Sequence, residues 1–422
     1  MSTKKQKLFH KIDHNLTRAY TTAKWIVFSI LTGILMGTVG SLFYHSIGLM
    51  TTLRSKYPYF LALLPIGAIL TYLLYLLAHD ENDGGTNLIL SAIQSHDHIP
   101  GRMSVLVFLS TLISHLVGAS VGREGAALQI GGSLGGYLGK CLKLDETEQK
   151  TMIMCGMSAA FSALFGTPMA ASIFSMEVVS VGIMHYAALV PCVLASYIAS
   201  EISHASGGES LHFSIQNIPA LDPAGIFYTF ILAIAFGLVS MLFCICLHGF
   251  EEFFRHILPS PIKRAFVCGS LVLVCTLISG SQTYNGSGVD SLDAFLAGEV
   301  LPWQFLVKIL FTSLSISAGY KGGEIIPSLF IGASFGSLIA SLFHLEPSLA
   351  AAVGMGSVFC GVTNCPITSL LLCFELFGSD AAAYFLISIS LSYVVSGYYS
   401  LYRSQKIVYS KFKSNYIDKK AQ

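Results

Sequence analysis

Two stretches of this chain carry the same pattern, and they decide its fold. Residues 156–177 read GMSAAFSALFGTPMAASIFSME, and residues 354–375 read GMGSVFCGVTNCPITSLLLCFE. Five positions recur at a constant separation: Gly156, Met157, Phe161, Pro168 and Glu177 match Gly354, Met355, Phe359, Pro366 and Glu375. Both copies lie in strongly apolar sequence. A duplication with so long a period is typical of a transporter built from two structural repeats, with its site between them.

The composition places the chain in a lipid bilayer. Hydrophobic residues make up 53% of the 422 residues and charged residues 11%, whereas a soluble domain carries roughly 25% charged residues. Long apolar runs without strict alternation favour membrane-spanning helices over a transmembrane barrel. Runs long enough to span lie at 25–49, 59–78, 103–121, 169–200, 224–249, 265–281, 304–320 and 380–402.

Other apolar runs are interrupted by Gly, Pro and polar residues, and we expect half-length helices there. They lie at 125–139, 151–165, 326–343, 348–362 and 366–377. The sequence therefore predicts an all-α polytopic membrane protein with broken and half-length helices.

The same patterns divide the chain into five parts. We expect a basic N-terminal segment at 1–24, a first transmembrane repeat at 25–202, a linker at 203–222, a second repeat at 223–402 and a basic tail at 403–422. The first apolar run is too long for a cleavable signal. Since both ends are basic, the positive-inside rule predicts a multi-pass protein of the cell membrane with both termini in the cytoplasm. A net charge of +1 gives no indication of nucleic-acid binding.

Further motifs recur between the two halves. Gly122-Arg123-Glu124 precedes Gly322-Gly323-Glu324 by 200 residues, and Gly84-Gly85 precedes Gly286-Ser287 by 202. Insertions and deletions in a diverged duplication produce such a drift. Each half is expected to contain a Gly-rich break, a G-x-E segment that opens a helix, and the G-M…P…E pair. This symmetry alone leaves open whether the repeats are parallel or inverted.

The first G-x-E segment carries the chemistry. A charge at membrane depth costs about 2.5–3.5 kcal/mol on insertion scales, so such residues persist mainly for function or as internal pairs. Glu124 precedes an apolar helix at 126–140, and a helix N-terminus offers unpaired N–H groups and partial positive charge. A carboxylate there can occupy an anion site, and a mobile anion or a proton can displace it. Glu124 is therefore predicted to gate an anion and to carry a proton.

The second copy, Gly319 to Pro327, has the same character. Pro327 fits a first helical turn, where its missing N–H is no loss, and Gly322 and Gly323 expose backbone N–H groups. We expect the two helix N-termini to converge on one site near the midplane, with Glu324 beside it.

With these motifs the chain resembles the CLC family of anion channels and anion/proton antiporters over residues 25–405. The family's G-R-E-G-P motif is present as Gly122-Arg123-Glu124-Gly125-Ala126, and its G-G-x-F-x-P motif as Gly322 to Pro327. Segments around Pro168 and Pro366 match later helices of each half. Tyr402 in Ser400-Leu401-Tyr402 matches the family's tyrosine whose hydroxyl coordinates the central anion.

The resemblance implies two inverted α-helical repeats, a homodimer with one pore per subunit, no cofactor, and Glu124 as the external gating glutamate. The residues implied for anion binding are Gly84, Gly85, Gly122, Arg123, Gly125, Gly323, Glu324, Ile325, Ile326 and Tyr402.

Three departures from the family pattern bear on the transported ion. The serine of the family's G-S-G-I-P loop is absent from Asp83-Gly84-Gly85-Thr86-Asn87, Val178 stands where chloride/proton exchangers have an internal glutamate, and Glu324 stands where an apolar residue is usual. Together they resemble the fluoride/proton antiporter branch, although Ile326 replaces the threonine common there. They favour a halide/proton antiporter, with fluoride slightly ahead of chloride, over an uncoupled chloride channel.

Other functions are open on the residues alone. A sodium-coupled transporter of organic substrates would need a larger cavity and cation sites. An intramembrane hydrolase would need a nucleophile and a base, but the G-x-S-x-G patterns at 131–135 and 332–336 fit close helix packing better. Glu177 and Glu375, at the same place in both repeats, are interpreted as scaffold residues. For the acidic residues Asp80, Glu81 and Asp83, a solvated loop is favoured over a proton-collecting role.

Overall fold

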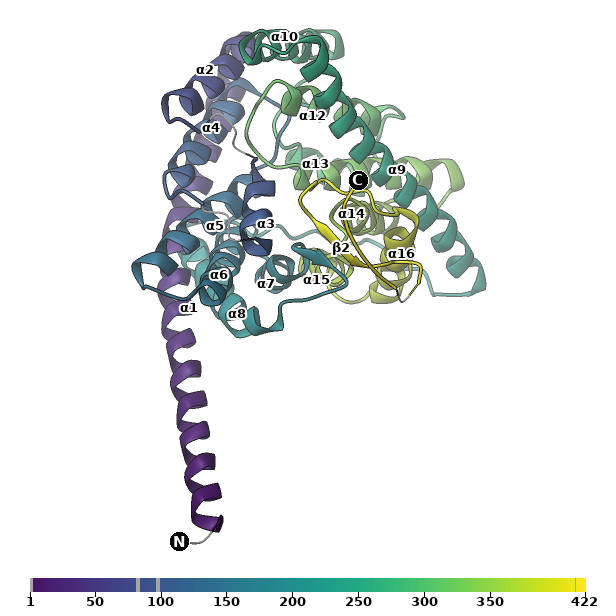
Figure 1. Ribbon diagram of the computed structural model, residues 1–422. Helices are drawn as coiled ribbons and strands as arrows, with labels where there is room; N and C mark the ends of the chain where they lie inside the picture. The colour runs from purple at the N-terminus through teal and green to yellow at the C-terminus, as the bar shows by residue number, and fades with distance from the viewer. Residues whose placement is uncertain (1–2, 81–83, 96–98, 414) are drawn as a thin grey trace.

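The computed structural model describes residues 3–80, 84–95, 99–413 and 415–422, and of residues 3–17 the backbone alone. The described residues form sixteen α-helices and a small three-stranded sheet (Figure 1). The first eight helices are α1 (Thr3–Lys56), α2 (Leu64–Leu77), α3 (Thr86–Gln94), α4 (Met103–Val117), α5 (Glu124–Cys141), α6 (Glu146–Phe165), α7 (Pro168–Glu177) and α8 (Leu189–Ala205).

The second eight helices repeat this order. They are α9 (Pro223–Ile257), α10 (Pro261–Ser279), α11 (Leu292–Leu296), α12 (Gln304–Ser317), α13 (Ile325–Phe343), α14 (Pro347–Thr363), α15 (Pro366–Phe377) and α16 (Ala382–Val395). The duplicated segments of the sequence thus become α6–α7 in one half and α14–α15 in the other, and the all-helical prediction is confirmed.

Among the described residues, six helical stretches are long and apolar enough to cross a membrane: Arg18–Lys56, Pro58–Leu77, Tyr186–Ala205, Pro223–Ile257, Pro261–Ser279 and Ile325–Phe343. Four predicted spans are wrong in length. The runs 103–121, 304–320 and 380–402 form helices of 15, 14 and 14 residues. The run 169–200 breaks after α7, because Ser180–Val181 forms a strand and Gly182 turns the chain with a φ of +90°.

Among the five segments predicted to form half-length helices, the prediction is wrong for α13, which is long and apolar enough to cross a membrane. α14 and α15 are shorter apolar helices of 17 and 12 residues, and α5 and α6 have 18 and 20 residues. Their glycines do not interrupt the helices; they allow two helices to touch. A Cβ on Gly131 would collide with the backbone of Gly156, and one on Gly332 with the backbone of Gly354. The G-x-S-x-G patterns are therefore packing surfaces, as expected.

Contacts between α7 and α15 show that the repeats are inverted. The Glu375 carboxylate, at the end of α15, accepts hydrogen bonds from Met169 N (2.7 Å) and Ala170 N (2.9 Å) at the start of α7. In return, Glu177 at the end of α7 accepts from Ile367 N (3.1 Å) and Thr368 N (2.8 Å) at the start of α15.

Each helix therefore caps the other, which requires the two to run antiparallel. Two equivalent helices that run antiparallel are related by a two-fold axis perpendicular to them, and for membrane helices this is an inverted repeat. The exchange also satisfies N–H groups that each helix leaves unpaired in its first turn. Glu177 and Glu375 thus serve the scaffold, as predicted.

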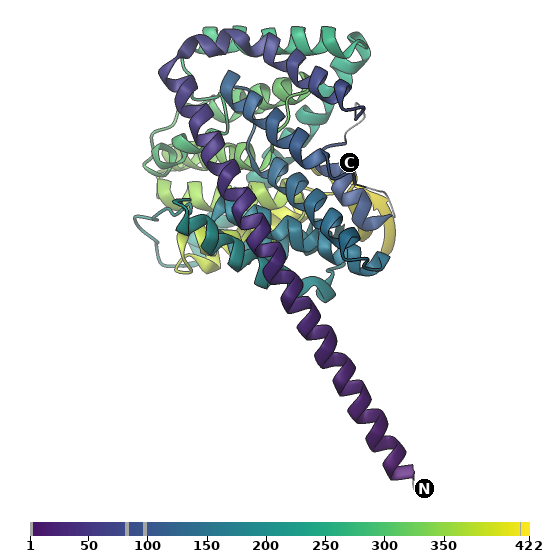
Figure 2. The same ribbon diagram turned by 90° about the vertical axis from the view of Figure 1, so that its left-hand side faces the viewer.

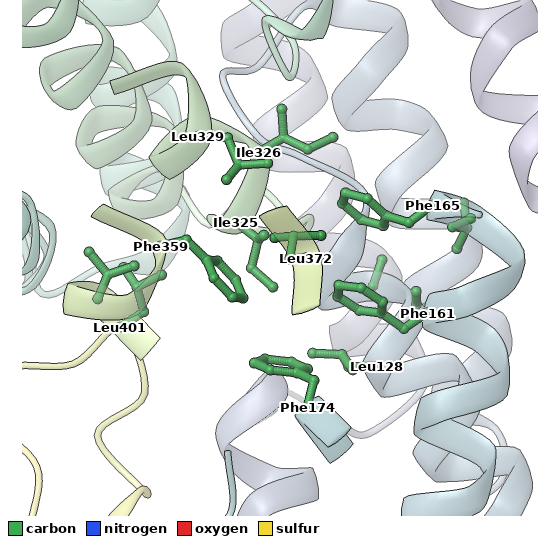
Figure 3. Packing of buried hydrophobic residues seen from close by; sticks show 14 of the residues in the cluster. Leu128, Phe161, Phe165, Phe174, Ile325, Ile326, Leu329, Phe359, Leu372 and Leu401 are labelled. Carbon is green, nitrogen blue, oxygen red and sulfur yellow. The ribbon is translucent and has the colours of Figure 1, made fainter. Parts of the chain in front are cut away.

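An aromatic cluster fills the seam between the repeats beside this pair. Phe174 lies 5.4 Å from Phe161 in its own half and 6.0 Å from Phe359 in the other, measured between ring centroids. Phe161 and Phe359 occupy matching positions of the duplication. Figure 3 shows these rings with Leu128 and Ile325, so the core joins both halves.

The chain ends behave differently from each other. The described part of the predicted basic segment 1–24, from Thr3 onward, belongs to α1, whose first part projects beyond the bundle in Figures 1 and 2. The tail folds back: β2 (Lys406–Tyr409) pairs in parallel with β1 (Ser180–Val181) and antiparallel with β3 (Tyr416–Lys420). The tail is thereby joined to the end of α7.

Glu375→Gln is expected to lower the thermal midpoint of unfolding. A carboxamide has one acceptor oxygen, so one N–H in the first turn of α7 loses its charge-assisted partner, at a cost of about 1–3 kcal/mol. Glu252→Gln, at an exposed position of α9, is the control and should melt like the wild type. Equal midpoints for all three proteins in a detergent melting assay would contradict the capping role.

Candidate functional site

The two repeats meet in a two-residue antiparallel bridge. Gly122 N donates to Gly323 O (2.6 Å), and Gly323 N donates to Gly122 O (2.9 Å). A Cβ on Gly323 would lie 2.5 Å from Gly125 N, so the backbones approach too closely for any side chain. The bridge brings the first turns of α5 and α13 together, as the sequence predicts.

This bridge corrects the alignment of the two G-x-E motifs by one residue. Arg123 is the N-cap of α5 and Glu324 is the N-cap of α13, with nearly the same backbone angles (φ −112° and −104°). The structural partner of Glu324 is therefore Arg123, and Glu124 corresponds to Ile325. Both motifs begin a helix, but Glu324 is the N-cap residue of α13, whereas Glu124 is the first residue after the N-cap of α5.

The Glu124 side chain is fully buried at this junction. Its Oε2 accepts from Ile326 N, in the first turn of α13, at 3.4 Å. The carboxylate also interacts with the backbone N–H groups of Arg123 and Glu124 at the start of α5. Oε1 has no hydrogen-bond partner among the described residues. One carboxylate thus faces the amide ends of two helices, where an anion is stabilised by N–H groups and by both helix dipoles.

A third helix N-terminus approaches from α3. Gly85 caps this helix with a φ of +61°, and the Thr86 hydroxyl faces Gly125 O at 3.5 Å. Gln129, one turn into α5, extends Nε2 to within 3.5 Å of the same hydroxyl. Gly85 therefore belongs to the cluster, whereas Gly84 is exposed at its edge.

Tyr402 contributes a buried hydroxyl that lacks a partner. The side chain is 2% exposed, and its OH makes no hydrogen bond to any described residue. It interacts electrostatically with Glu324 and Glu124. Leaving a buried hydroxyl unpaired costs free energy. A desolvated anion beside this hydroxyl would accept its hydrogen bond.

Glu324 interacts with Tyr402 and with other charged groups near the junction. It is half-buried and interacts electrostatically with Glu124, with Lys321 and with Glu251 of α9. The side chains of Ile325 and Ile326 belong to the apolar cluster (Figure 3), and the backbone N–H of Ile326 donates to the Glu124 carboxylate.

The Arg123 side chain packs on Tyr44 and interacts electrostatically with Glu124. Its guanidinium lies over the Tyr44 ring at 4.8 Å and lines a cavity of about 860 Å³ that also contains Arg54, Asp290 and Ile326. Arg123 therefore sets the electrostatic potential on one approach to the junction. Its backbone N–H, however, belongs to the site.

The structure describes only part of the acidic run for which the sequence left a proton-collecting role open. Asp80 accepts hydrogen bonds from Arg102 Nε (2.6 Å) and Nη2 (3.0 Å), and Glu81 and Asp83 lie outside the described residues.

The sequence analysis missed two polar side chains of the site, Thr86 and Gln129. Thr86 directly follows the Gly84-Gly85 motif, and Gln129 lies four residues after Gly125, on the same face of the helix. Helical spacing from the motif could have identified Gln129.

Comparison with known proteins agrees with this architecture. The family described as voltage gated chloride channel matches residues 66–397. A chloride/fluoride channel protein of Pseudomonas syringae pv. tomato is 35% identical, over 92% of this chain and 88% of its own length. An H(+)/Cl(-) exchange transporter, ClcA, of Vibrio cholerae is 25% identical, over 86% of this chain and 84% of its own length.

Solved structures give the same result. A CLC-type fluoride/proton antiporter superposes with a TM-score of 0.88 at 30% identity, covering 92% of this chain and 98% of its own. A slow cyanobacterial Cl⁻/H⁺ antiporter superposes at 0.74 and 20% identity, which shows the fold alone. The duplicated helices, the bridged glycines and these matches together establish that the chain belongs to the voltage-gated chloride channel (CLC) family, whose members are membrane transport proteins and not enzymes.

Proposed function

We propose that this protein exchanges a halide for protons across the cell membrane, with fluoride slightly favoured over chloride. The observation that carries the proposal is the position of Glu124: its carboxylate lies on the amide ends of α5 and α13, where a small anion would bind. An anion and this carboxylate compete for the same N–H groups. A proton that neutralises Glu124 releases it, so anion movement and proton movement are coupled.

The preference for fluoride rests on four supports. Glu324 replaces an apolar residue beside the anion path, and Val178 stands where chloride/proton exchangers have a glutamate. The relative from Pseudomonas syringae carries fluoride in its name, and the solved structure with a TM-score of 0.88 is a fluoride/proton antiporter. In this proposal Glu324 passes protons, and Tyr402, Gly85, Gly125 and Gly323 surround the anion.

The assembly and orientation are part of the same proposal. Both basic termini lie in the cytoplasm, in keeping with the positive-inside rule. The protein works as a homodimer with one pore in each subunit, as the family resemblance implies. Lipid surrounds the exposed apolar faces of helices such as α9 and α10.

The wild-type protein in liposomes is expected to move anions and protons together. Liposomes loaded with fluoride or with chloride are diluted into halide-free buffer, and anion efflux and internal pH are recorded at the same time. Proton uptake in fixed ratio to efflux is expected, faster with fluoride than with chloride. An anion current that is unaffected by a pH gradient would indicate a passive channel.

Glu124→Ala is expected to abolish proton coupling. The variant retains the amide ends of α5 and α13 but has no carboxylate to displace, so anion movement no longer requires a proton. The same assay should show efflux with no pH change. Proton movement in the wild-type ratio would refute the assigned role, with exposed Glu252→Gln as the matched control.

Glu324→Gln is expected to slow fluoride turnover by on the order of a hundredfold, the low end of what a proton-transfer group typically contributes. Glutamine has a similar shape and cannot ionise, so the effect isolates proton transfer from packing. Initial efflux rates at saturating fluoride measure it. Wild-type turnover would contradict the fluoride assignment and leave the role of Glu124 intact.

A further inference from the structure

The segment that carries Tyr402 is not a regular helix and must be held by other elements. α16 ends at Val395, and β2 begins at Lys406. Between them, Leu401 N donates to Val362 O of α14 (2.9 Å), and Ser404 N donates to Asn87 Oδ1 of α3 (2.9 Å). These contacts hold the segment on either side of the tyrosine, one to a helix of each repeat. His248 of α9 also contacts the segment on both sides of Tyr402.

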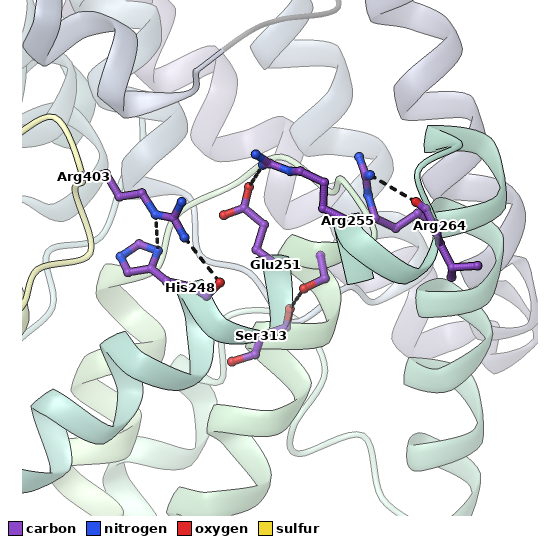
Figure 4. A network of polar contacts seen from close by, with 8 residues as sticks. His248, Glu251, Arg255, Arg264, Ser313 and Arg403 are labelled. Atoms are coloured by element: carbon purple, nitrogen blue, oxygen red, sulfur yellow. Dashed lines mark hydrogen bonds and ion pairs between the residues drawn. The ribbon is translucent and has the colours of Figure 1, made fainter. Parts of the chain in front are cut away.

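His248 binds the residues flanking Tyr402 with both of its ring nitrogens. Nε2 lies 2.8 Å from Ser400 O, and Nδ1 accepts from Arg403 Nε at 3.2 Å (Figure 4). Arg403 Nη2 also donates to the His248 carbonyl at 3.3 Å. Since a carbonyl can only accept, Nε2 carries the hydrogen and Nδ1 has the free lone pair. Both contacts require the neutral imidazole in this tautomer.

We propose that His248 is a positioning residue, which holds Tyr402 at the anion path by fixing Ser400 and Arg403 on either side of it. The inference rests on the proposed role of Tyr402 as an anion ligand. The ring spans the segment because its donor and acceptor point in different directions. A carboxamide side chain can reproduce either contact and not both.

The same geometry makes the contact sensitive to protonation. A proton on Nδ1 removes the lone pair that accepts from Arg403 and places two positive groups against each other. The charged groups that face the imidazole are Arg403 from the tail and Glu251 on α9, and Glu251 is also paired with Arg255. Protonation would release one side of the tyrosine segment.

The test is the concentration dependence of fluoride efflux from liposomes containing the full-length protein. His248→Leu should raise the apparent KM by on the order of tenfold, the effect of weakening one hydrogen bond to an anion. Turnover at saturation should stay within about twofold, since the proton-transfer groups are untouched. His248→Gln and His248→Asn, which each retain one contact, should lie between. His256→Leu, at an exposed position of the same helix, is the control.

Two further measurements separate positioning from general damage. If His248 acts through the tyrosine, His248→Leu has little additional effect in a Tyr402→Phe background. The KM ratio of His248→Leu to wild type should fall toward one when the pH is low enough to protonate His248, because protonation opens the contact in the wild type. Melting midpoints identify variants that fold poorly. If His248→Leu is one of them, His248→Gln is compared with the wild type in its place.

The outcomes distinguish the two levels of the proposal. A wild-type KM in His248→Leu alongside an impaired Tyr402→Phe would overturn the role of His248 alone. Additive effects in the double variant, or a KM ratio that does not change with pH, would do the same. A wild-type KM in Tyr402→Phe, with coupled exchange intact in the wild type, would remove the tyrosine from the anion path and the inference with it.

Discussion

The structure depends on two helix N-termini that meet, unpaired, inside an apolar protein. The reciprocal hydrogen bonds between Gly122 and Gly323 bring the first turns of α5 and α13 into contact. The N–H groups there have no helical partners. Negative charge is the simplest way to satisfy them. The buried Glu124 carboxylate supplies it in this structure, and under the proposed function a mobile anion takes its place.

The inverted duplication makes that junction possible. α7 and α15 cap each other through Glu375 and Glu177, and aromatic rings from both halves fill the space beside them. A parallel pair of repeats would place like ends of equivalent helices at the same face, so each carboxylate would lie beside the C-terminus of the other helix and have no N–H partners there. The same two-fold relation that brings α7 and α15 together also brings α5 and α13 tip to tip. Scaffold and site are therefore consequences of one symmetry.

Function requires that this symmetry be broken. At equivalent N-cap positions one repeat has Arg123 and the other Glu324, and the next residues are Glu124 and Ile325. The guanidinium faces the cavity beside Tyr44, while Glu324 faces Tyr402. Tyr402 itself comes from the segment between α16 and β2, which is held by α3, α9 and α14. This segment thus completes on one side a site that the helix ends alone would make nearly symmetric.

Composition and duplication by themselves determined that the protein is helical, lies in a membrane and has its site where two broken segments meet. These properties follow from local chemistry: apolar runs, glycines that expose N–H groups, and a carboxylate that is costly in lipid and persists there mainly for function. Some helix lengths were mispredicted, because a glycine such as Gly131 suggests a helix break in the sequence. In the structure Gly131 instead packs closely against Gly156 of the neighbouring helix. Inversion, the one-residue offset between Glu124 and Glu324, and the contact of His248 with Ser400 and Arg403 were decided only by the tertiary structure. Each depends on which surfaces pack together across more than a hundred residues of chain, and no local pattern records that.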